Sequence, residues 1–238
     1  MRTLAVLPIK NFDSAKERLA ERLGSGSRQM LARSMFSDVL ASLRHVPGLD
    51  AIAVVTDDRE AESASAGTGT SLLRDTERAG QSAAARIGVR HAIESGYERV
   101  LLVPGDVPLL DHTEVRGMLS RAASNERPVT IVPDRHGEGT NALLLSPPDA
   151  IDPAFGPRSL ERHVAAAEAA GVAYAVEELP SLIHDVDTPD DLTELTRLLQ
   201  TLHGSAPMTR GTLNQIDRLH GGAEPGPGAA PGEPAVRG

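Results

Sequence analysis

"RVLLVPGD", residues 99–106, is the most strand-like stretch of this 238-residue sequence. Four consecutive apolar residues follow Arg99, and Pro104, Gly105 and Asp106 end the run. A short continuous apolar run that is bounded by turn residues is typical of a buried strand. Ligands of open α/β sheets bind beyond the carboxyl ends of the strands, so Asp106 is a candidate functional residue.

The composition of the chain favours the same kind of sheet. Hydrophobic residues make up 40% of the sequence, which is enough for one sizeable core and predicts one or two domains. Aromatic residues make up only 2%, so Leu, Val, Ile and Ala must fill that core. Small and branched side chains suit helices that pack on a mostly parallel sheet. We therefore expect an α/β fold with a mixed, mostly parallel sheet and flanking helices.

Strand and helix patterns alternate on the N-terminal side of this stretch. Strands are predicted at 3–9 and 51–58, and a short strand at 71–73. A helix of small residues is predicted at about 81–95. Another helix follows a Ser-rich start, because one helical face carries the apolar residues Leu31, Met35, Phe36, Val39, Leu40 and Leu43.

The alternation continues on the C-terminal side. Asp111 and Glu114 resemble a capping box that begins a helix. Two paired strands are predicted at 128–133 and 142–146, around a Gly-containing turn. A helix and then a strand are expected at 159–170 and 172–177.

The last predicted helix begins at Thr188. Thr188 is a favourable N-cap, Pro189 suits the first helical position, and two aspartates follow in the first turn, where the helix dipole favours negative charge. The apolar face of this helix consists of Leu192, Leu195 and Leu199.

The composition changes at about residue 204. The stretch that follows ends in "GGAEPGPGAAPGEPAVRG" (221–238), which has almost no large apolar side chains. Such a composition cannot offset the entropy cost of ordering the chain. We therefore predict one domain at 1–203 and a disordered Gly/Pro-rich tail at 204–238.

Charge and composition exclude several classes of function. A net charge of −9 argues against a general nucleic-acid binder. The sequence has no Cys, which excludes disulfides and thiolate zinc sites. It contains no run of about 18 apolar residues, so no membrane span is expected, and its N-terminus lacks a secretory signal. We expect a cytoplasmic enzyme.

Three loops beyond predicted strand ends carry charged residues, and one of these loops is basic while two are acidic. Their charged residues are Lys10, Lys16 and Arg18 after the first strand, Asp106 after the central strand, and Asp185 and Asp187 before the last helix. Carboxylates suit a hard cation such as Mg²⁺, which also binds substrate phosphates. Lysine and arginine suit the phosphates themselves. Together the loops predict a site for a metal-bound nucleoside triphosphate.

Each of these residues also has a structural interpretation that the sequence leaves open. Asp106 can be a turn residue and Asp187 a helix-entry residue beside Thr188. The three basic residues can form a solvated face, as most charge clusters do. The glycines of "HGEGTN" (136–141) can do no more than turn a hairpin.

The order of the motifs favours the functional interpretation. The chain resembles the phosphoenolpyruvate or 2-phospholactate guanylyltransferases, which begin side-chain assembly of the deazaflavin coenzyme F-420. The resemblance covers residues 3–200 and rests on "PIKNFDSAKERLA", "PGDVPLL", "GEGTNALL", "FGPRS" and "HDVDTPDDL". It implies a single-domain fold of the glycosyltransferase-A type, as in nucleotide-diphospho-sugar transferases. It also implies the transfer of GMP from GTP to a small phosphorylated carboxylic acid, with release of pyrophosphate.

The matching motifs imply roles for individual residues. Asp106 and Asp187 would bind Mg²⁺ and, with Lys16, form the catalytic group. The resemblance implies phosphoenolpyruvate binding by Thr140, Gly156 and Ser159. From the residues alone, Ser159 starts a predicted helix, where backbone N–H groups and the helix dipole favour an anion. The residues expected to bind the triphosphate of GTP are Lys10, Lys16 and Arg18.

The expected chemistry needs no general base. The acceptor is itself a phosphate with a second pKa near 6, so it is largely dianionic at neutral pH. Alignment for in-line attack and neutralisation of charge would provide the catalysis. The resemblance also implies that the product passes to the next enzyme of the deazaflavin pathway, and a homodimer is one option for the oligomeric state.

Several alternatives remain open at this stage. The acceptor can be phosphoenolpyruvate, 2-phospho-L-lactate or 3-phosphoglycerate. Gln81 and Ser82 replace the Leu-Asn pair that is common in related enzymes, which leaves the choice of base open. More distant alternatives are a molybdopterin or sugar-phosphate nucleotidyltransferase, although the Gly-rich opening loop of those enzymes is absent, and a non-catalytic module that binds GTP.

Overall fold

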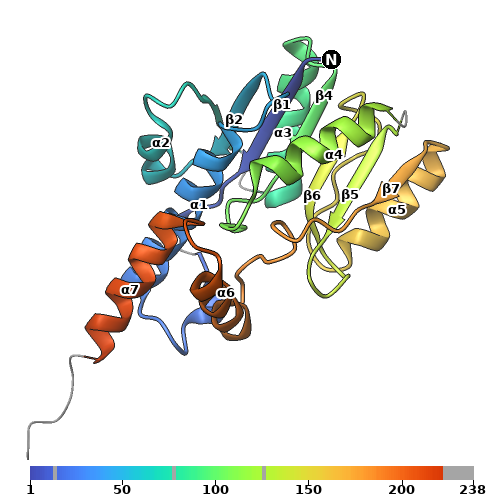
Figure 1. The fold of residues 1–238 in the computed structure, drawn as a ribbon. Coiled ribbons are helices and arrows are strands. Elements are labelled where there is room, and N and C mark those ends of the chain that lie inside the picture. The colour runs from blue at the N-terminus through green and yellow to red at the C-terminus, as the bar shows by residue number, and fades with distance from the viewer. Residues whose placement is uncertain (13–14, 77–78, 125–126, 222–238) are drawn as a thin grey trace, which may run out of the picture.

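A single seven-stranded sheet forms the centre of the molecule (Figure 1). The structure is a computed structural model that describes residues 1–12, 15–76, 79–124 and 127–221. The strand order is β3-β2-β1-β4-β6-β5-β7. The strands are β1 (Thr3–Pro8), β2 (Ala51–Thr56), β3 (Ser71–Arg74), β4 (Arg99–Leu102), β5 (Val129–Pro133), β6 (Thr140–Leu145) and β7 (Tyr174–Val176).

The direction of β6 distinguishes it from the other strands. It pairs antiparallel with both β4 and β5, whereas every other described pair is parallel. The amino end of β6 therefore lies at the sheet edge where the neighbouring strands have their carboxyl ends. The mixed, mostly parallel sheet that the sequence predicts is confirmed.

Helices cover both faces of the sheet because side chains of a strand alternate between the two faces. On β1, Ala5 and Leu7 pack with the helices of one face, while Leu4 and Val6 pack with those of the other face. The first face carries α1 (Ser25–Leu43), α2 (Arg59–Ser65) and α4 (His112–Ser124). The second face carries α3 (Gln81–Glu94) and α5 (Ser159–Ala170). All six apolar residues predicted for the face of the first helix are buried.

The contact between α3 and β1 is unusually close. A Cβ atom on Gly88 of α3 would lie 2.3 Å from Val6 Cγ1 of β1. Real side chains do not tolerate such a distance, so the glycine allows the helix to approach the strand. The small residues of α3 thus set how deeply it seats on the sheet.

A third apolar cluster lies beyond the sheet, around α6 (Pro189–Thr201) and α7 (Pro207–Gly221). In Figure 1, α7 lies beside α1. The cluster also includes Leu19 of the short 3₁₀ helix η2 (Glu17–Leu19). It joins the C-terminal helices to the segment that follows β1.

This cluster shows that the tail boundary predicted at residue 204 was wrong. Residues 204–221 were predicted to be disordered, but α7 is helical and buries Leu213 and Ile216. Asp38 of α1 accepts hydrogen bonds from the backbone N–H groups of Met208 (3.1 Å) and Thr209 (2.8 Å) at the start of α7. The prediction was wrong because it judged this helix by the average composition of a longer stretch. The remainder of the predicted tail, 222–238, lies outside the described residues.

The two predicted caps have different outcomes. Thr188 is the N-cap of α6, as expected, and Asp191 completes a capping box with it that the sequence did not predict. Asp111 caps the backbone N–H groups of Thr113 and Glu114, but the Glu114 carboxylate accepts from Ser181 N instead of returning to Asp111. This second contact connects α4 to the segment that leads to α6. No helix of the described chain is long and apolar enough to cross a membrane.

Candidate active site

Two adjoining cavities open at the edge where the parallel strands end. The smaller one measures about 230 Å³ and lies over the loop after β1; the larger one measures about 570 Å³ and lies over the start of β6. Both cavities are lined by Gln81, Pro104, Asp106 and Asp187. The direction of β6 explains this arrangement, because its first residues meet the ends of the parallel strands. Chain segments far apart in the sequence thus meet at two carboxylates.

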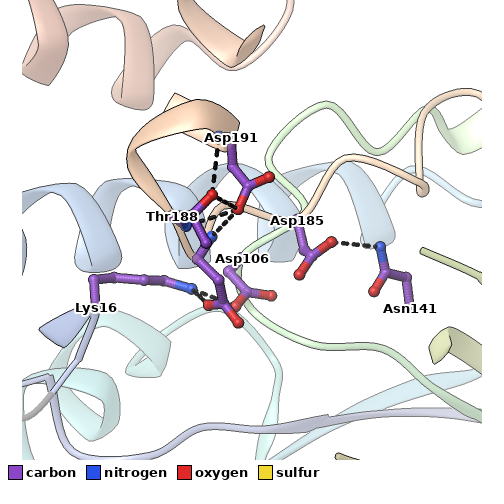
Figure 2. A network of polar contacts seen from close by, with 7 residues as sticks. Lys16, Asp106, Asn141, Asp185, Thr188 and Asp191 are labelled. Carbon is purple, nitrogen blue, oxygen red and sulfur yellow. Dashed lines mark hydrogen bonds and ion pairs between the residues drawn. The ribbon is translucent and has the colours of Figure 1, made fainter. Parts of the chain in front are cut away.

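Lys16 is held between these two carboxylates. Its Nζ atom lies 2.5 Å from Asp106 Oδ2 and 2.8 Å from Asp187 Oδ1, and its side chain is only 7% exposed (Figure 2). The backbone of Lys16 has a φ of 58°, in the left-handed region. Leu19, which is fully buried one turn later, anchors the same segment. The basic loop thus presents one ammonium group to both predicted metal ligands.

The ion pairs determine the charge state of this group. Burial alone would lower the pKa of Lys16, but the carboxylates of Asp106 and Asp187 offset that effect and raise it. Burial likewise works against ionisation of Asp187, yet the charges of Lys16, Arg18 and Lys10 lower its pKa. At neutral pH, Lys16 is therefore a cation and Asp187 an anion.

Two backbone features bring Asp106 to Lys16. A Cβ atom on Gly105 would lie 2.4 Å from Ile9 Cδ1, so the glycine lets the loop after β4 pass close to the end of β1. Phe12 N donates to Asp58 Oδ2 (2.8 Å), which fastens the loop after β1 to the end of β2. The relative position of the two loops is thus set by close packing and a buried hydrogen bond.

Asp187 is positioned by the capping box of α6. Asp191 Oδ2 accepts from the backbone N–H groups of both Asp187 (3.0 Å) and Thr188 (2.7 Å) (Figure 2). Asp191 also forms an ion pair with Arg135, at 2.6 Å. The side chain of Asp187 is 51% exposed and remains accessible from the cavities.

Asp185 is a third carboxylate at this site. The sequence identified its loop, but the metal prediction named only Asp106 and Asp187. Asn141 Nδ2 donates to Asp185 Oδ1 at 3.1 Å (Figure 2). The same nitrogen donates to the Leu182 carbonyl at 2.8 Å. Burial, and then the negative charge of Asp106, raise the pKa of Asp185 to about 6. The spacing Asp-Val-Asp was a signal for this residue, but not for its orientation.

The site offers two carboxylates as ligands for Mg²⁺. In the part of the chain that the structure describes, no three acidic or histidine side chains form a metal site by themselves. Two carboxylates nevertheless converge within hydrogen-bond distance of one cation, the Lys16 ammonium. Mg²⁺ is commonly bound by one or two carboxylates together with substrate phosphates and water. Asp106 and Asp187 fit that mode of binding.

The three residues expected to bind the phosphorylated acid lie together in the larger cavity. Thr140 begins β6, Gly156 lies in the loop before α5, and Ser159 is the first residue of α5. Gly156 has a φ of 111°, which is accessible to glycine and strained for other residues. Arg158, the residue before Ser159, also lines this cavity and has a φ of 54°.

The basic residues divide between the cavities. Lys10 and Lys16 line the smaller cavity, whereas Arg18 lines the larger one. The three had been expected to bind the triphosphate as a group, and the geometry separates Arg18 from Lys10. Ser82 Oγ donates to the Phe155 carbonyl (3.3 Å), so this hydroxyl supports the loop that carries Gly156. Gln81 lines both cavities.

Known structures share this architecture. A nucleotide-diphospho-sugar transferase structure from Desulfovibrio desulfuricans matches with a TM-score of 0.72 at 20% identity, over 92% of this chain and 97% of that one. A CMP:2-keto-3-deoxy-manno-octonic acid synthetase, solved with CTP, matches with a TM-score of 0.58 at 14% identity, over 84% and 99% of the chains. These similarities show the fold.

Sequence relatives are considerably more similar. A protein of Conexibacter woesei named phosphoenolpyruvate guanylyltransferase is 48% identical over 220 residues, which cover 92% of this chain and 99% of that protein. A 3-phospho-D-glycerate guanylyltransferase of Colwellia psychrerythraea is 33% identical, over 91% and 98% of the chains. A 2-phospho-L-lactate guanylyltransferase of Methanothermobacter thermautotrophicus is 29% identical, over 91% and 92%.

The family match extends over nearly the whole described chain. The family model described as "Guanylyl transferase CofC like" matches residues 3–220, which include both cavities and reach through α6 into α7. This range includes every site residue that the sequence predicted. The chain belongs to the CofC-like guanylyl transferase family.

Proposed function

We propose that this protein transfers GMP from GTP to phosphoenolpyruvate, which yields enolpyruvyl-diphospho-guanosine and pyrophosphate. The observation that carries the proposal is the meeting of two cavities at Asp106 and Asp187, with Lys16 between these carboxylates. A transfer reaction needs two substrates whose reacting phosphates approach one another at a charge-neutralising site. The names of relatives at 48% and 37% identity support phosphoenolpyruvate as the acceptor.

The two cavities suit different substrates. The smaller one combines Lys10 and Lys16 with an apolar wall that includes Phe12 and Met35, which suits a nucleotide. The larger one combines Thr140 and the start of α5 with nearby arginines, which suits a small acid with a phosphate and a carboxylate. GTP would bind in the smaller cavity with its triphosphate directed toward Asp106.

The reaction is a direct displacement at phosphorus. An oxygen of the phosphoenolpyruvate phosphate forms a bond to the α-phosphorus of GTP, and the bond from that phosphorus to the bridging oxygen of pyrophosphate breaks. The attacking phosphate is largely dianionic at neutral pH, so no side chain must remove a proton. The protein aligns the two phosphates and neutralises their charge.

Asp106 and Asp187 would hold Mg²⁺, and the half-exposed Asp187 side chain is available for this role. When bound, the ion would neutralise charge on the triphosphate and on the leaving pyrophosphate. Lys16 stays protonated and would move from the carboxylates to phosphate oxygens. Asp191 would keep Asp187 in place through its backbone bond during this exchange.

The remaining parts of the proposal concern the setting of the reaction. The product would enter side-chain assembly of coenzyme F-420 in the cytoplasm. The closest alternatives are the same transfer to 2-phospho-L-lactate or to 3-phosphoglycerate, and relatives named for both reactions match at lower identity.

Pyrophosphate release provides the test. The purified protein is mixed with GTP, Mg²⁺ and each of the three acids in turn, and then with phosphoenolpyruvate and each other nucleoside triphosphate. We expect the highest kcat/KM with GTP and phosphoenolpyruvate. Preference for another acid would change the acceptor assignment. GTP binding without pyrophosphate from any acid would contradict the proposed transferase activity.

A further inference from the structure

His163 is a buried histidine that neither the motifs nor the proposed mechanism uses. It lies in the second turn of α5, and its side chain is 0% exposed. Its ring lies between the two chain segments that form the acceptor side of the larger cavity, namely the start of β6 and the loop before α5. It therefore touches both parts of the expected acid-binding site without lining the cavity itself.

The two ring nitrogens of His163 have different partners. The backbone N–H of Ala154 donates to Nε2 at 2.8 Å, so Nε2 is unprotonated. Nδ1 lies 3.0 Å from Thr140 Oγ1. A neutral imidazole carries its hydrogen on one nitrogen, so Nδ1 carries it here and donates to the Thr140 hydroxyl oxygen.

The protonation state of His163 agrees with this assignment. Burial, and then the nearby Arg162 guanidinium, lower the pKa of His163 to about 4. The ring is therefore neutral at neutral pH, with a single N–H available.

This tautomer determines what the Thr140 hydroxyl can do. A hydroxyl group has one hydrogen to donate and two lone pairs that accept. Because Thr140 Oγ1 accepts from His163, its own hydrogen stays available for an oxygen in the cavity that Thr140 lines. An anionic substrate requires donors, so this orientation suits a phosphate or a carboxylate.

The hydrogen bond at His163 Nε2 fixes the loop before α5, which is the other part of the expected acid-binding site. Ala154 belongs to the loop that leads to Gly156, and the Phe155 ring lies edge-on to His163, with 5.3 Å between ring centroids. Arg162 Nη2 donates to the Ala154 and Phe155 carbonyls, at 2.8 and 2.9 Å. The loop before α5 is therefore held to α5 by two consecutive side chains.

We propose that His163 is a positioning residue for the acceptor acid: it makes the Thr140 hydroxyl a donor to the acid and holds the loop of Gly156 against α5. This inference rests on the proposed function for the identity of the acid. It predicts that changes at His163 affect the acceptor and leave GTP binding intact, because Thr140, Ala154 and Phe155, the partners of His163 described above, do not line the smaller cavity.

Two substitutions separate the two bonds. In His163→Gln, the side-chain oxygen can reach the position of Nε2 and accept from Ala154, while the donor to Thr140 is lost. In His163→Asn, the side-chain amide can reach the position of Nδ1 and donate to Thr140, while the acceptor for Ala154 is lost. We expect each to raise the KM for phosphoenolpyruvate about tenfold, with the KM for GTP changed less than about twofold. His163→Ala should have the largest effect.

A double-mutant cycle tests the path through Thr140. Thr140→Val removes the hydroxyl and keeps the shape of the side chain. If His163 acts through that hydroxyl, His163→Gln should raise the acceptor KM much less in the Thr140→Val background than in the native one. Additive effects of the two changes would overturn this path.

A matched control distinguishes positioning from a general loss of stability. Ser34→Ala removes another buried hydroxyl contact, the 2.7 Å bond between Ser34 and Thr212, and neither of these residues lines either cavity. It should lower the melting temperature without changing either KM. If the His163 variants shift both KM values as they lose stability, His163 has only a structural role.

Two measurements keep the inference separate from the proposed activity. Nitrogen-15 NMR of labelled histidine should show His163 with a protonated Nδ1 and an unprotonated Nε2, and the opposite tautomer would overturn the inference. Calorimetric titration with phosphoenolpyruvate should show weaker binding to His163→Gln than to the native protein, whether or not turnover occurs. If the native protein binds the acid but releases no pyrophosphate, the proposed function fails and this inference stands. Equal affinity for the two proteins would contradict the inference alone.

Discussion

At the scale of single residues, backbone strain coincides with the two cavities. Three non-glycine residues of the described chain have positive φ, and two of them are Lys16 and Arg158. A left-handed conformation costs about 1–2 kcal/mol for such a residue. Lys16 retains it because two ion pairs hold its side chain. The strain is thus placed where side chains must be presented to charged ligands, as is common at functional sites.

The metal assignment can be tested at Asp106. Asp106→Asn is nearly isosteric, but it removes a charge that Mg²⁺ and Lys16 would share. We expect the variant to fold and kcat to fall at least about a hundredfold, the size of effect seen when one electrostatic contact to a transition state is removed. Steady-state kinetics and a melting curve check both parts. Asp152→Asn, which neutralises an exposed aspartate outside both cavities, serves as the control. A folded Asp106→Asn protein with near-normal kcat would remove the assignment.

The division of the site between two substrates can be tested at Ser159 and Lys16. Loss of one hydrogen bond to a charged group costs about 1.5–3 kcal/mol. Ser159→Ala should therefore raise the KM of the acceptor about ten- to a hundredfold and leave the KM of GTP nearly unchanged. Lys16→Met should raise the KM of GTP and leave the KM of the acceptor nearly unchanged. If Ser159→Ala weakens GTP and spares the acid, the assignment of the two cavities is wrong.

Single residues also show how far the sequence could predict the site. Lys16, Asp106 and Asp187 meet as expected, because each follows or precedes a recognisable strand or helix. Their metal-binding role stays a prediction. His163 and Asn141 could not be found in this way, because their importance comes from contacts outside their own elements: His163 with the Thr140 hydroxyl, and Asn141 with the Leu182 carbonyl.

At the scale of secondary structure, α7 has the clearest role in stability. Its residues Leu213 and Ile216 are buried, and its first turn is capped by Asp38. Each fully buried Leu or Ile side chain contributes about 1.5–3 kcal/mol. A helix near the chain end thus supports η2 and, through it, the loop of Lys16.

Two truncations test this role. A chain that ends at residue 203 loses all of α7, and we expect its free energy of unfolding to fall by about 4 kcal/mol or more. The melting temperature should then fall by about 8 °C or more. A chain that ends at Gly221 keeps every described contact of α7 and should have the same melting temperature as the full-length protein. Equal melting temperatures for all three proteins would show that α7 contributes no stability.

Local signals predicted some elements and missed others for physical reasons. Thr188 predicted the start of α6 because capping depends on residues close in sequence. The predicted return hydrogen bond between the Glu114 carboxylate and Asp111 is absent. Glu114 accepts instead from Ser181 N, a partner that lies far away in sequence. The helix α7 was missed because its apolar residues are few and their burial depends on α1 and α6.

At the scale of the whole molecule, His163 makes stability depend on pH. Its pKa is about 4 in the folded protein, below the ordinary value of about 6.5 that the unfolded chain has. Between these values the unfolded state binds a proton that the folded state does not. The contribution of His163 is therefore complete above about pH 6.5 and declines as the pH falls toward 4.

Denaturant titrations at two pH values check this expectation. On going from pH 7 to pH 4.5, the native protein should lose about 2 kcal/mol more unfolding free energy than His163→Asn, which does not titrate. Arg162 is the charged neighbour that contributes to the low pKa of His163. An equal loss for both proteins would show that His163 titrates alike in the folded and unfolded states.

The overall architecture was only partly accessible to the sequence. Alternating strands and helices predicted the α/β class and the mostly parallel sheet. The strand order, and the direction of β6 between β4 and β5, depend on pairing among strands that are distant in sequence. These pairings determine that Thr140 lies at the same edge as Asp106, and no local pattern encodes them.

The apolar cluster that α7 shares with the segment after β1 has a consequence during synthesis. A chain leaves the ribosome amino end first, at about 5–20 residues per second, so the Lys16 loop emerges long before the helix that completes its apolar support. We expect a nascent chain, or a product of premature termination, to lack a settled triphosphate loop. Incomplete copies would then neither sequester GTP nor consume the acceptor, and the ability to bind substrates would arise only when α7 has been released.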